Sequence, residues 1–251
     1  DNQEVIEETE EELSVFSSES IPEFSNEANI MPATADGTDH INEINMDEIN
    51  NKPYNKNNGK WEITSVGSYR FNGKSPNDAP IIIDNIDSGT VKVYLNNVNI
   101  ETASGPALQI TSDVQAQVCI YLENENNLIT TNVNSAGLQK DNIANLTIDN
   151  SSGTPGILTA QNSAPYACGA GIGGGVNGSC SNITINGGSV NASSFWGAGI
   201  GSGFGDGSSG SCSNITINGG SVNASSTNGT DIGSGRAAFL TGRRGSCSNI
   251  T

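Results

Sequence analysis

The sequence predicts an all-β fold: a single-stranded right-handed parallel β-helix preceded by a disordered acidic segment. From Trp61 onward, short segments rich in β-branched residues alternate apolar and polar side chains. The phrase GSCSNITINGGSVNASS fills residues 178–194 and recurs unchanged at 210–226. Apolar anchors follow one another at intervals of 30, 34, 28 and 32 residues, at Leu108, Leu138, Ile172, Ile200 and Ile232. Periods of roughly 20–50 residues are typical of stacked units that bury their apolar faces against their neighbours.

The first 58 residues differ from the rest in charge. Residues 1–50 hold 15 of the 27 acidic residues and no Lys or Arg, in a chain whose formal net charge is −17. Because like charges oppose folding there, we expect residues 1–58 to form a disordered acidic leader. The remaining residues are close to neutral and lack the basic footprint of a nucleic-acid-binding protein. No apolar run is long enough to span a membrane, so we expect no transmembrane segment.

Residues 59–251 are expected to form the parallel β-helix. Within it, 59–106 supplies the N-terminal cap and the first coil, and 107–166 supplies degenerate coils. The range 167–251 supplies regular Gly-rich repeats, and it stops inside a third copy of the repeated phrase. We therefore expect the chain to be part of a longer protein. In such a fold the coils lie about 4.8 Å apart, and alternate side chains of each strand point into the core.

Identical residues at one register are expected to stack as ladders along the solenoid. In one predicted ladder each side-chain amide bonds to the copies above and below, at Asn182, Asn214 and Asn249. A second ladder contains sulfur, at Cys180, Cys212 and Cys247. A Cα spacing of about 4.8 Å is within disulfide reach, but three members cannot all pair. The favoured interpretation of these cysteines is therefore a small buried apolar side chain.

Three segments resemble a known family. They are SYRFNG (68–73), IIIDNIDSGTVKVYLNNVNIETASGPALQI (81–110) and VCIYLENENNLIT (118–130). They are similar to the opening of carbohydrate-binding, polysaccharide-lyase-like β-helix proteins of anaerobic bacteria, which have a pectin-lyase-like solenoid. The later GSCSNITINGGSVNAS coils are similar to Gly-rich repeats of secreted surface proteins. The resemblance implies binding of cellulose-like and acidic polysaccharides, calcium on the helix, and no established hydrolytic activity.

Acidic residues on the expected coil edges are candidate calcium ligands. Carboxylates of adjacent coils can converge on one cation, because Ca²⁺ takes several oxygen ligands. Glu123, Glu125 and Asp149 are favoured because they flank aligned strand ends. The alternative is an ordinary solubilising surface. No run of acidic residues carries over a calcium site of the family residue by residue.

A break in the repeat marks the candidate carbohydrate site. Phe195 and Trp196 stand where the next coil has Thr227 and Asn228. Because the stack does not require aromatic residues there, the substitution points to a function. Exposed rings suit the C–H faces of sugars, so Phe195, Trp196 and Tyr166 are the predicted carbohydrate-binding residues. The alternative is an aromatic side chain folded back over its loop.

The residues for acid–base chemistry are sparse. From Asn150 to Gly235 the acidic residues are Asp206 and Asp231, and there is no Lys or Arg. A lyase on this fold needs a carboxylate cluster holding calcium and a basic residue, so no catalytic residue is assigned. We expect a secreted or cell-surface, non-catalytic protein that binds polysaccharide or cell-wall glycan. The alternatives are a structural stalk or adhesin spacer of a larger surface protein, or a polysaccharide lyase or glycoside hydrolase.

Overall fold

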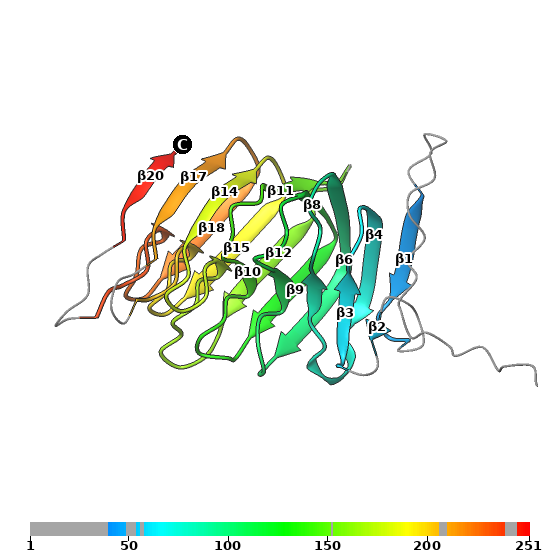
Figure 1. The fold of residues 1–251 in the computed structure, drawn as a ribbon, viewed down its shortest axis with the longest axis horizontal. Coiled ribbons are helices and arrows are strands. Elements are labelled where there is room, and N and C mark those ends of the chain that lie inside the picture. The colour runs from blue at the N-terminus through cyan, green and yellow to red at the C-terminus, as the bar shows by residue number, and fades with distance from the viewer. Residues whose placement is uncertain (1–39, 49–53, 56–57, 152, 206–209, 239–244) are drawn as a thin grey trace, which may run out of the picture.

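The computed structural model describes residues 40–48, 54–55, 58–151, 153–205, 210–238 and 245–251. In these residues the chain winds into about six turns of a parallel β-solenoid without an α-helix (Figure 1). One short 3-10 helix, η1 (Pro76–Asp78), interrupts the strands. The parallel β-helix that the sequence predicts is therefore confirmed. No helix of the described ranges is long and apolar enough to cross a membrane.

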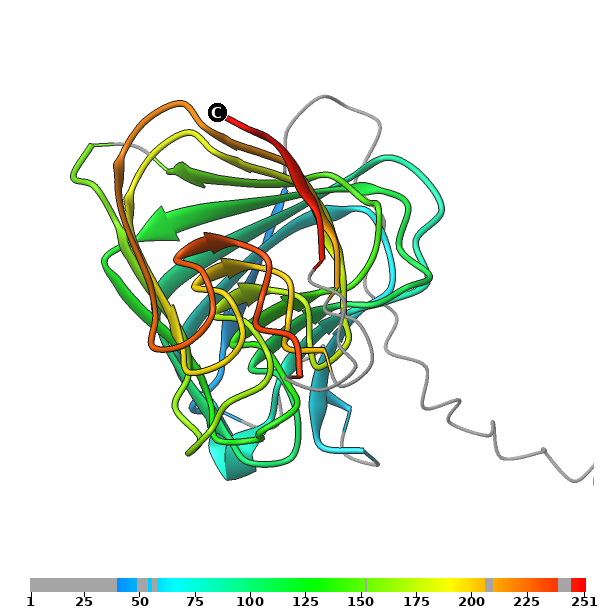
Figure 2. The ribbon, with the colours of Figure 1, turned by 90° about the vertical axis from the view of Figure 1, so that its left-hand side faces the viewer.

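The strands lie on three faces, which Figure 2 shows from one end of the solenoid. Face 1 contains β1 (Ile41–Asn45), β4 (Gly67–Lys74), β8 (Gln117–Glu123), β11 (Leu146–Asn150), β14 (Cys180–Ile185), β17 (Cys212–Ile217) and β20 (Cys247–Ile250). Face 2 contains β9 (Glu125–Thr130), β12 (Ile157–Asn162), β15 (Ser189–Ser194) and β18 (Ser221–Ser226). Face 3 contains β2 (Tyr54–Asn55), β3 (Lys60–Ile63), β5 (Ile81–Ile83), β7 (Leu108–Ile110), β10 (Leu138–Lys140), β13 (Ile172–Gly173), β16 (Ile200–Gly201) and β19 (Ile232–Gly233).

Faces 1 and 2 form one continuous sheet because the long strand β6 (Thr90–Thr102) belongs to both. Residues 90–96 of β6 pair with β8 on face 1, and residues 99–102 pair with β9 on face 2. Strands of successive turns pair in parallel, whereas β2 and β3 pair antiparallel. Each turn therefore runs from face 3 to face 1 to face 2 before the next turn begins.

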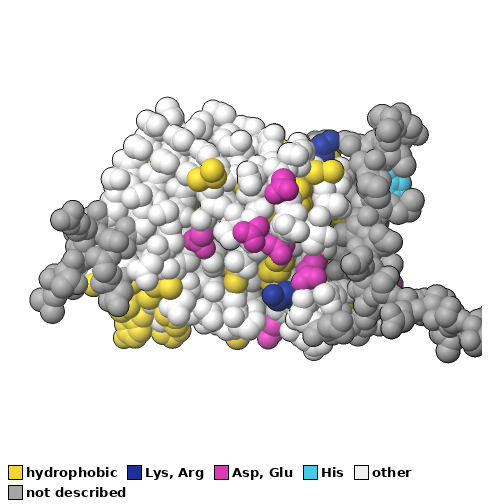
Figure 3. Space-filling model, viewed as in Figure 1, with side chains coloured by type: hydrophobic (Ala, Val, Ile, Leu, Met, Phe, Trp, Pro, Cys, Tyr) yellow, Lys and Arg dark blue, Asp and Glu magenta, His cyan; other side chains and the backbone are white. Residues whose placement is uncertain are grey.

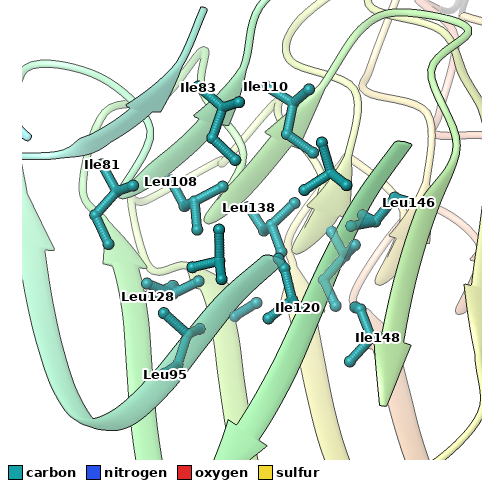
Figure 4. Packing of buried hydrophobic residues seen from close by; sticks show 14 of the residues in the cluster. Ile81, Ile83, Leu95, Leu108, Ile110, Ile120, Leu128, Leu138, Leu146 and Ile148 are labelled. Atoms are coloured by element: carbon teal, nitrogen blue, oxygen red, sulfur yellow. The ribbon is translucent and has the colours of Figure 1, made fainter. Parts of the chain in front are cut away.

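The apolar anchors of successive coils are direct neighbours on face 3, as their spacing predicts. The paired residues run in order through Leu108, Leu138, Ile172, Ile200 and Ile232. On the other faces every second side chain turns inward, as in β15, where Val190 and Ala192 are buried. Figure 4 shows Leu and Ile side chains of all three faces pointing toward one another. Burial of each large side chain contributes roughly 1.5–3 kcal/mol, so stacking supplies the stability that one coil lacks.

The solenoid begins earlier than residue 59, which corrects the predicted boundary of the leader. Strand β1 pairs in register with β4 and places Ile44 beside Phe71, and both side chains are buried. Met46 is buried as well. The acidic residues of this segment obscure its alternation of apolar and polar side chains. Its few apolar residues nevertheless pack against the first turn of the solenoid. The rest of the predicted leader, at 1–39, 49–53 and 56–57, lies outside the described residues.

The asparagine ladder is continuous through three coils of face 1. Asn214 Nδ2 donates to Asn182 Oδ1 at 2.9 Å, and Asn249 Nδ2 donates to Asn214 Oδ1 at 2.9 Å. All three residues have a positive φ, between 53° and 56°. This left-handed conformation is one that Asn tolerates better than most residues, because its short polar side chain can hydrogen-bond locally. Asn is therefore suited to this position for two reasons: it adopts the left-handed backbone conformation, and its side chain forms the hydrogen bonds of the ladder.

The cysteine ladder places two buried thiols in contact. Cys180, Cys212 and Cys247 pair in register, and the Cys180 Sγ lies 3.4 Å from the Cys212 Sγ. All three are free thiols; Cys180 and Cys212 are buried, while Cys247 is exposed. The neighbouring thiol of Cys180 and burial both raise the pKa of Cys212. The two buried members fill the core as small apolar groups.

Lys140 is a buried cation that the sequence pattern does not reveal. It is the last residue of β10, and its side chain is 0% exposed. Its Nζ donates to the carbonyl oxygens of Asn142 at 2.8 Å and Ser181 at 2.7 Å. Burial lowers the pKa of Lys140 to about 8, although Cys180 and Asp141 act in the opposite direction. The ammonium group joins two successive turns of the solenoid.

The contribution of Lys140 to stability is expected to depend on pH. Its pKa is 10.5 in an unfolded chain and about 8 in the fold, so between these values the unfolded state binds a proton that the folded state lacks. The contribution is therefore lowest below pH ~8 and rises by up to about 3 kcal/mol as the pH approaches ~10.5.

Urea unfolding of the wild type and of Lys140→Met across this pH range measures the effect. The difference between the two proteins removes the contribution of every group that the substitution leaves unchanged. We expect the wild type to gain stability relative to the variant as the pH rises. A difference that stays constant from pH ~7 to ~10 would contradict the lowered pKa.

Candidate functional site

The corner between faces 2 and 3 is fastened in the same way in four successive coils. The last residue of each face-2 stretch turns inward and its side chain donates to a loop carbonyl at 2.6 Å. These bonds join Thr130 to Gly105, Asn162 to Ser135, Ser194 to Gly169, and Ser226 to Gly197. Because every corner is held at the same register, the residues that follow each strand form a row along the solenoid.

Four aromatic side chains gather at this corner, and we call Tyr166, Phe195, Trp196 and Phe204 the aromatic cluster. The Tyr166 ring centroid lies 5.3 Å from that of Phe195 and 5.4 Å from that of Trp196. The ring centroids of Trp196 and Phe204 lie 5.2 Å apart, and their ring planes are tilted by 31° to each other. Tyr166 is 60% exposed, whereas the other three rings are half-buried. Figure 3 shows hydrophobic side chains gathered at the lower left, beneath the C-terminal coils.

Tyr166 is held outward by a tight turn. Ala167 N–H donates to the Ala164 carbonyl at 3.2 Å, so Pro165 and Tyr166 are the two central residues of the turn. Tyr166 has a φ of 58°, a left-handed value at a position that usually carries Gly or Asn. A bulky residue in this region costs roughly 1–2 kcal/mol. The backbone therefore bears strain in order to present an aromatic ring to solvent, and such strain tends to gather at functional sites.

A pocket of 370 Å³ adjoins the aromatic cluster and extends over three coils. Its volume is in the range of small-molecule sites, roughly 300–1,000 Å³. The lining side chains are uncharged, and most are polar: Gln161, Asn162, Ser163, Ala164, Ser193, Ser194, Phe195, Ser225, Ser226 and Thr227. Phe195 belongs to both the pocket and the cluster, so an apolar surface and a polar one meet at that residue.

One row of the pocket is free to bond a ligand. Gln161, Ser193 and Ser225 are in-register neighbours on β12, β15 and β18. Their side chains make no hydrogen bond to any other described residue, whereas Ser194 and Ser226 are committed to loop carbonyls. The row therefore offers an amide and two hydroxyls, repeated at the coil spacing of about 4.8 Å. Alternating donors and acceptors beside an aromatic face are well suited to a sugar, which has hydroxyls at its edge and C–H groups on its face.

The predicted calcium ligands do not form a cluster. Glu123 accepts from Arg70 Nη2 at 3.0 Å and from Ser151 Oγ at 2.7 Å, so its charge is already compensated. Asp149 accepts from the backbone N–H of Asn150, and Glu125 is exposed. In the ranges that the structure describes, no group of three or more His, Cys, Asp or Glu side chains could hold a metal ion. Calcium binding stays a prediction of the sequence.

A second aromatic pair, on face 1, is less suited to a sugar. Tyr94 and Tyr121 stack at 4.9 Å with ring planes 21° apart, and the Arg70 guanidinium lies 5.0 Å from the centre of the Tyr94 ring. Their ring faces are thus turned to each other and to Arg70. Because a sugar stacks on an open ring face, Tyr166 is the better platform.

Comparisons with known proteins agree with this architecture. Residues 57–152 match a family described as carbohydrate-binding domain-containing protein, and residues 183–204 and 215–237 match the beta helix repeat. No curated protein and no solved structure matches the chain. The chain is a parallel β-solenoid; two segments of its C-terminal coils are similar to beta helix repeats, and its N-terminal turns are similar to carbohydrate-binding domains. The matched range 183–204 includes Phe195, Trp196 and Phe204.

The structure brings together the three predicted carbohydrate-binding residues, Tyr166, Phe195 and Trp196, and adds Phe204, which the sequence analysis did not single out. Phe204 follows β16, and its backbone N–H donates to the Cys168 carbonyl at 2.6 Å. This bond brings a loop from the next corner against Trp196. The free row of Gln161, Ser193 and Ser225 was missed as well. The outward alternation along face 2 was a usable signal for that row.

Proposed function

We propose that this protein binds polysaccharide at the aromatic cluster without cleaving it, outside the cell or on its surface. The observation that carries the proposal is an exposed aromatic ring on a strained turn, beside a pocket in which one row of polar side chains is free. The resemblance of residues 57–152 to carbohydrate-binding domains supports a sugar as the ligand class. Polysaccharides and cell-wall glycans are extracellular ligands, which is the reason for the proposed location.

The proposal of binding without cleavage depends on the carboxylates near the pocket. A glycoside hydrolase uses two carboxyl groups about 5–9.5 Å apart. Between residues 150 and 235 the sequence holds two acidic residues, Asp206 and Asp231, and Asp206 lies outside the described residues. The described residues of this range therefore supply one carboxyl group, where that mechanism uses two. We therefore expect no release of reducing sugar or of unsaturated uronate from any polysaccharide that the protein binds.

Replacing Phe195 and Trp196 by the residues of the next coil tests the proposal. Thr227 and Asn228 occupy the same positions one turn later, so the solenoid tolerates the variant Phe195→Thr/Trp196→Asn. Loss of two half-buried rings is expected to weaken retention of the protein in polysaccharide gels at least tenfold, with unchanged circular dichroism. Each gel is run with and without calcium. Equal retention of the wild type in the two gels would show that binding does not require calcium.

The matched control is Ile143→Asn. Ile143 is 80% exposed and lies on a different corner, so the control removes surface hydrophobicity but leaves the cluster intact. Retention equal to the wild type is expected for this control. If the double variant is retained as strongly as the wild type, the aromatic cluster is not the binding site.

A structural stalk is the second candidate function. The observation that favours it is the regularity of face 1, where ladders of identical residues continue through three coils, as with Asn182, Asn214 and Asn249. Such ladders stabilise a rod without requiring a ligand. A stalk predicts that no polysaccharide retards the wild-type protein at all, which the same gels would show.

A further inference from the structure

We propose that the aromatic cluster and its pocket take a linear uncharged glycan lying along the solenoid axis, and that Asp231 excludes acidic sugars from it. This inference depends on the proposed function, because it names the ligand class and the specificity residue of the same site. It combines the direction of the free polar row, the absence of charge among the residues that line the pocket, and the contact of one carboxylate with a lining residue.

The direction of the ligand follows from the pocket. Its lining residues come from three successive coils, at equivalent positions of β12, β15 and β18. The free row of Gln161, Ser193 and Ser225 therefore runs across the strands, parallel to the solenoid axis. A ligand that bonds to all three side chains has to cross the coils, and a linear chain of sugars has the required length and repetition.

The preference for an uncharged glycan follows from the lining. No Lys, Arg or His side chain lines the pocket. A uronate carboxylate buried here would lose water without gaining a cationic partner, which costs free energy. Sugar hydroxyl groups pay a smaller desolvation cost, because the free row replaces the hydrogen bonds that they lose to water. Arg236 approaches the cluster through its backbone N–H, which donates to the Trp196 carbonyl at 2.9 Å, but it does not line the pocket.

Asp231 adds a negative charge next to a lining residue of this pocket. Its Oδ1 accepts from the backbone N–H of Ser226, a lining residue, at 2.9 Å. The preceding coil has Gly199 at the equivalent position, one residue before the paired anchors Ile200 and Ile232. The carboxylate is thus not required by the repeat. An exposed charge beside an uncharged site repels ligands of like charge, which raises specificity without strengthening the favoured complex.

Isothermal titration with oligosaccharides tests the inference. The probes are three neutral hexasaccharides (cello-, xylo- and mannohexaose) and two acidic ones (oligogalacturonate and oligomannuronate). The proteins are the wild type, Asp231→Asn and Tyr166→Gly. The asparagine keeps an oxygen acceptor for the Ser226 N–H, so the corner remains intact. Asp231→Gly, which copies Gly199 of the preceding coil, is a second variant without the charge.

The wild type is expected to bind at least one neutral hexasaccharide, and to bind the acidic ones about tenfold more weakly or not at all. Asp231→Asn is expected to strengthen acidic binding about 3- to 10-fold at low salt and to leave neutral binding within about twofold. Because the repulsion is between exposed charges, the gain should shrink above about 0.5 M salt. Gln161→Ala and Ser225→Ala are both expected to weaken binding of the neutral hexasaccharide.

Three results would overturn the inference. Acidic binding as tight as neutral binding in the wild type would contradict the uncharged ligand. An unchanged ratio of acidic to neutral affinity in both Asp231 variants would remove the role of Asp231. A loss in only one of the two row variants would contradict a ligand that crosses the coils. Failure of the proposed function looks different, because then no probe shows an affinity that Tyr166→Gly reduces.

Discussion

Gly201→Ala is expected to destabilise the C-terminal coils by more than about 4 kcal/mol. Gly201 has a φ of 147° and pairs with Gly173 and Gly233 of the adjacent coils. A Cβ at Gly201 would collide with the carbonyl oxygen of Gly233, and a Cβ at Gly173 would collide with that of Gly201. Because these atoms belong to the backbone, no side chain can move aside. The coils must separate, which costs more than ordinary overpacking in a core, typically about 1–3 kcal/mol.

Urea denaturation followed by circular dichroism measures this loss, with Gly105→Ala as the control. A Cβ at Gly105 meets no atom within 4 Å, and Gly105 has no positive φ. The control is therefore expected to unfold within about 0.5 kcal/mol of the wild type. If Gly201→Ala and Gly105→Ala have the same free energy of unfolding, the close stacking of Gly173, Gly201 and Gly233 does not limit the stability of these coils.

Tyr166→Gly is expected to weaken glycan binding strongly and to raise the stability of the fold. The ring is the most exposed member of the aromatic cluster, so its loss removes the platform for the sugar face. We expect affinity to fall at least tenfold, about 1.4 kcal/mol. Glycine adopts the φ of 58° without steric cost, so relief of strain is expected to raise the free energy of unfolding by about 1 kcal/mol. Few variants that remove a large side chain have this expected combination.

Tyr166→Phe is the matched control for this prediction. It keeps the ring and the strained backbone, so both binding and stability should stay close to the wild type. Titration calorimetry gives the affinity, and urea denaturation gives the stability. Wild-type affinity in Tyr166→Gly would show that the ring is not in contact with the ligand. A large loss of stability would show that Tyr166 is part of the fold instead of the site.

The periodic part of this fold was predictable from the sequence, because stacking forces equivalent residues into register. Leu108 and Leu138 are 30 residues apart in the chain and direct neighbours in the sheet. The same logic located Phe195 and Trp196, since a residue that breaks the repeat is visible against identical copies. Strand β1 was not predictable in this way, because it belongs to no repeat and its two apolar residues lie in an acidic segment.

The remaining features depend on contacts that no repeat encodes. Phe204 reaches Trp196 because its loop bonds to Cys168, a contact set by the folding of two loops. Lys140 ends the segment AGLQK, which has the composition of a solvated strand end, yet the carbonyls of Asn142 and Ser181 draw its ammonium group into the interior. The Arg70–Glu123 ion pair joins residues 53 positions apart, and it occupies a carboxylate that strand alignment alone assigned to calcium.

Quenching of tryptophan fluorescence by acrylamide tests the central claim most directly. The chain has two tryptophans: Trp61 is 0% exposed in the core, and Trp196 lies in the aromatic cluster. Quenching of the folded protein therefore reports on Trp196. A saturating neutral hexasaccharide, shown by calorimetry to bind, is expected to lower the quenching constant at least twofold by covering the cluster. An unchanged quenching constant with the glycan bound would place the carbohydrate site elsewhere on the solenoid.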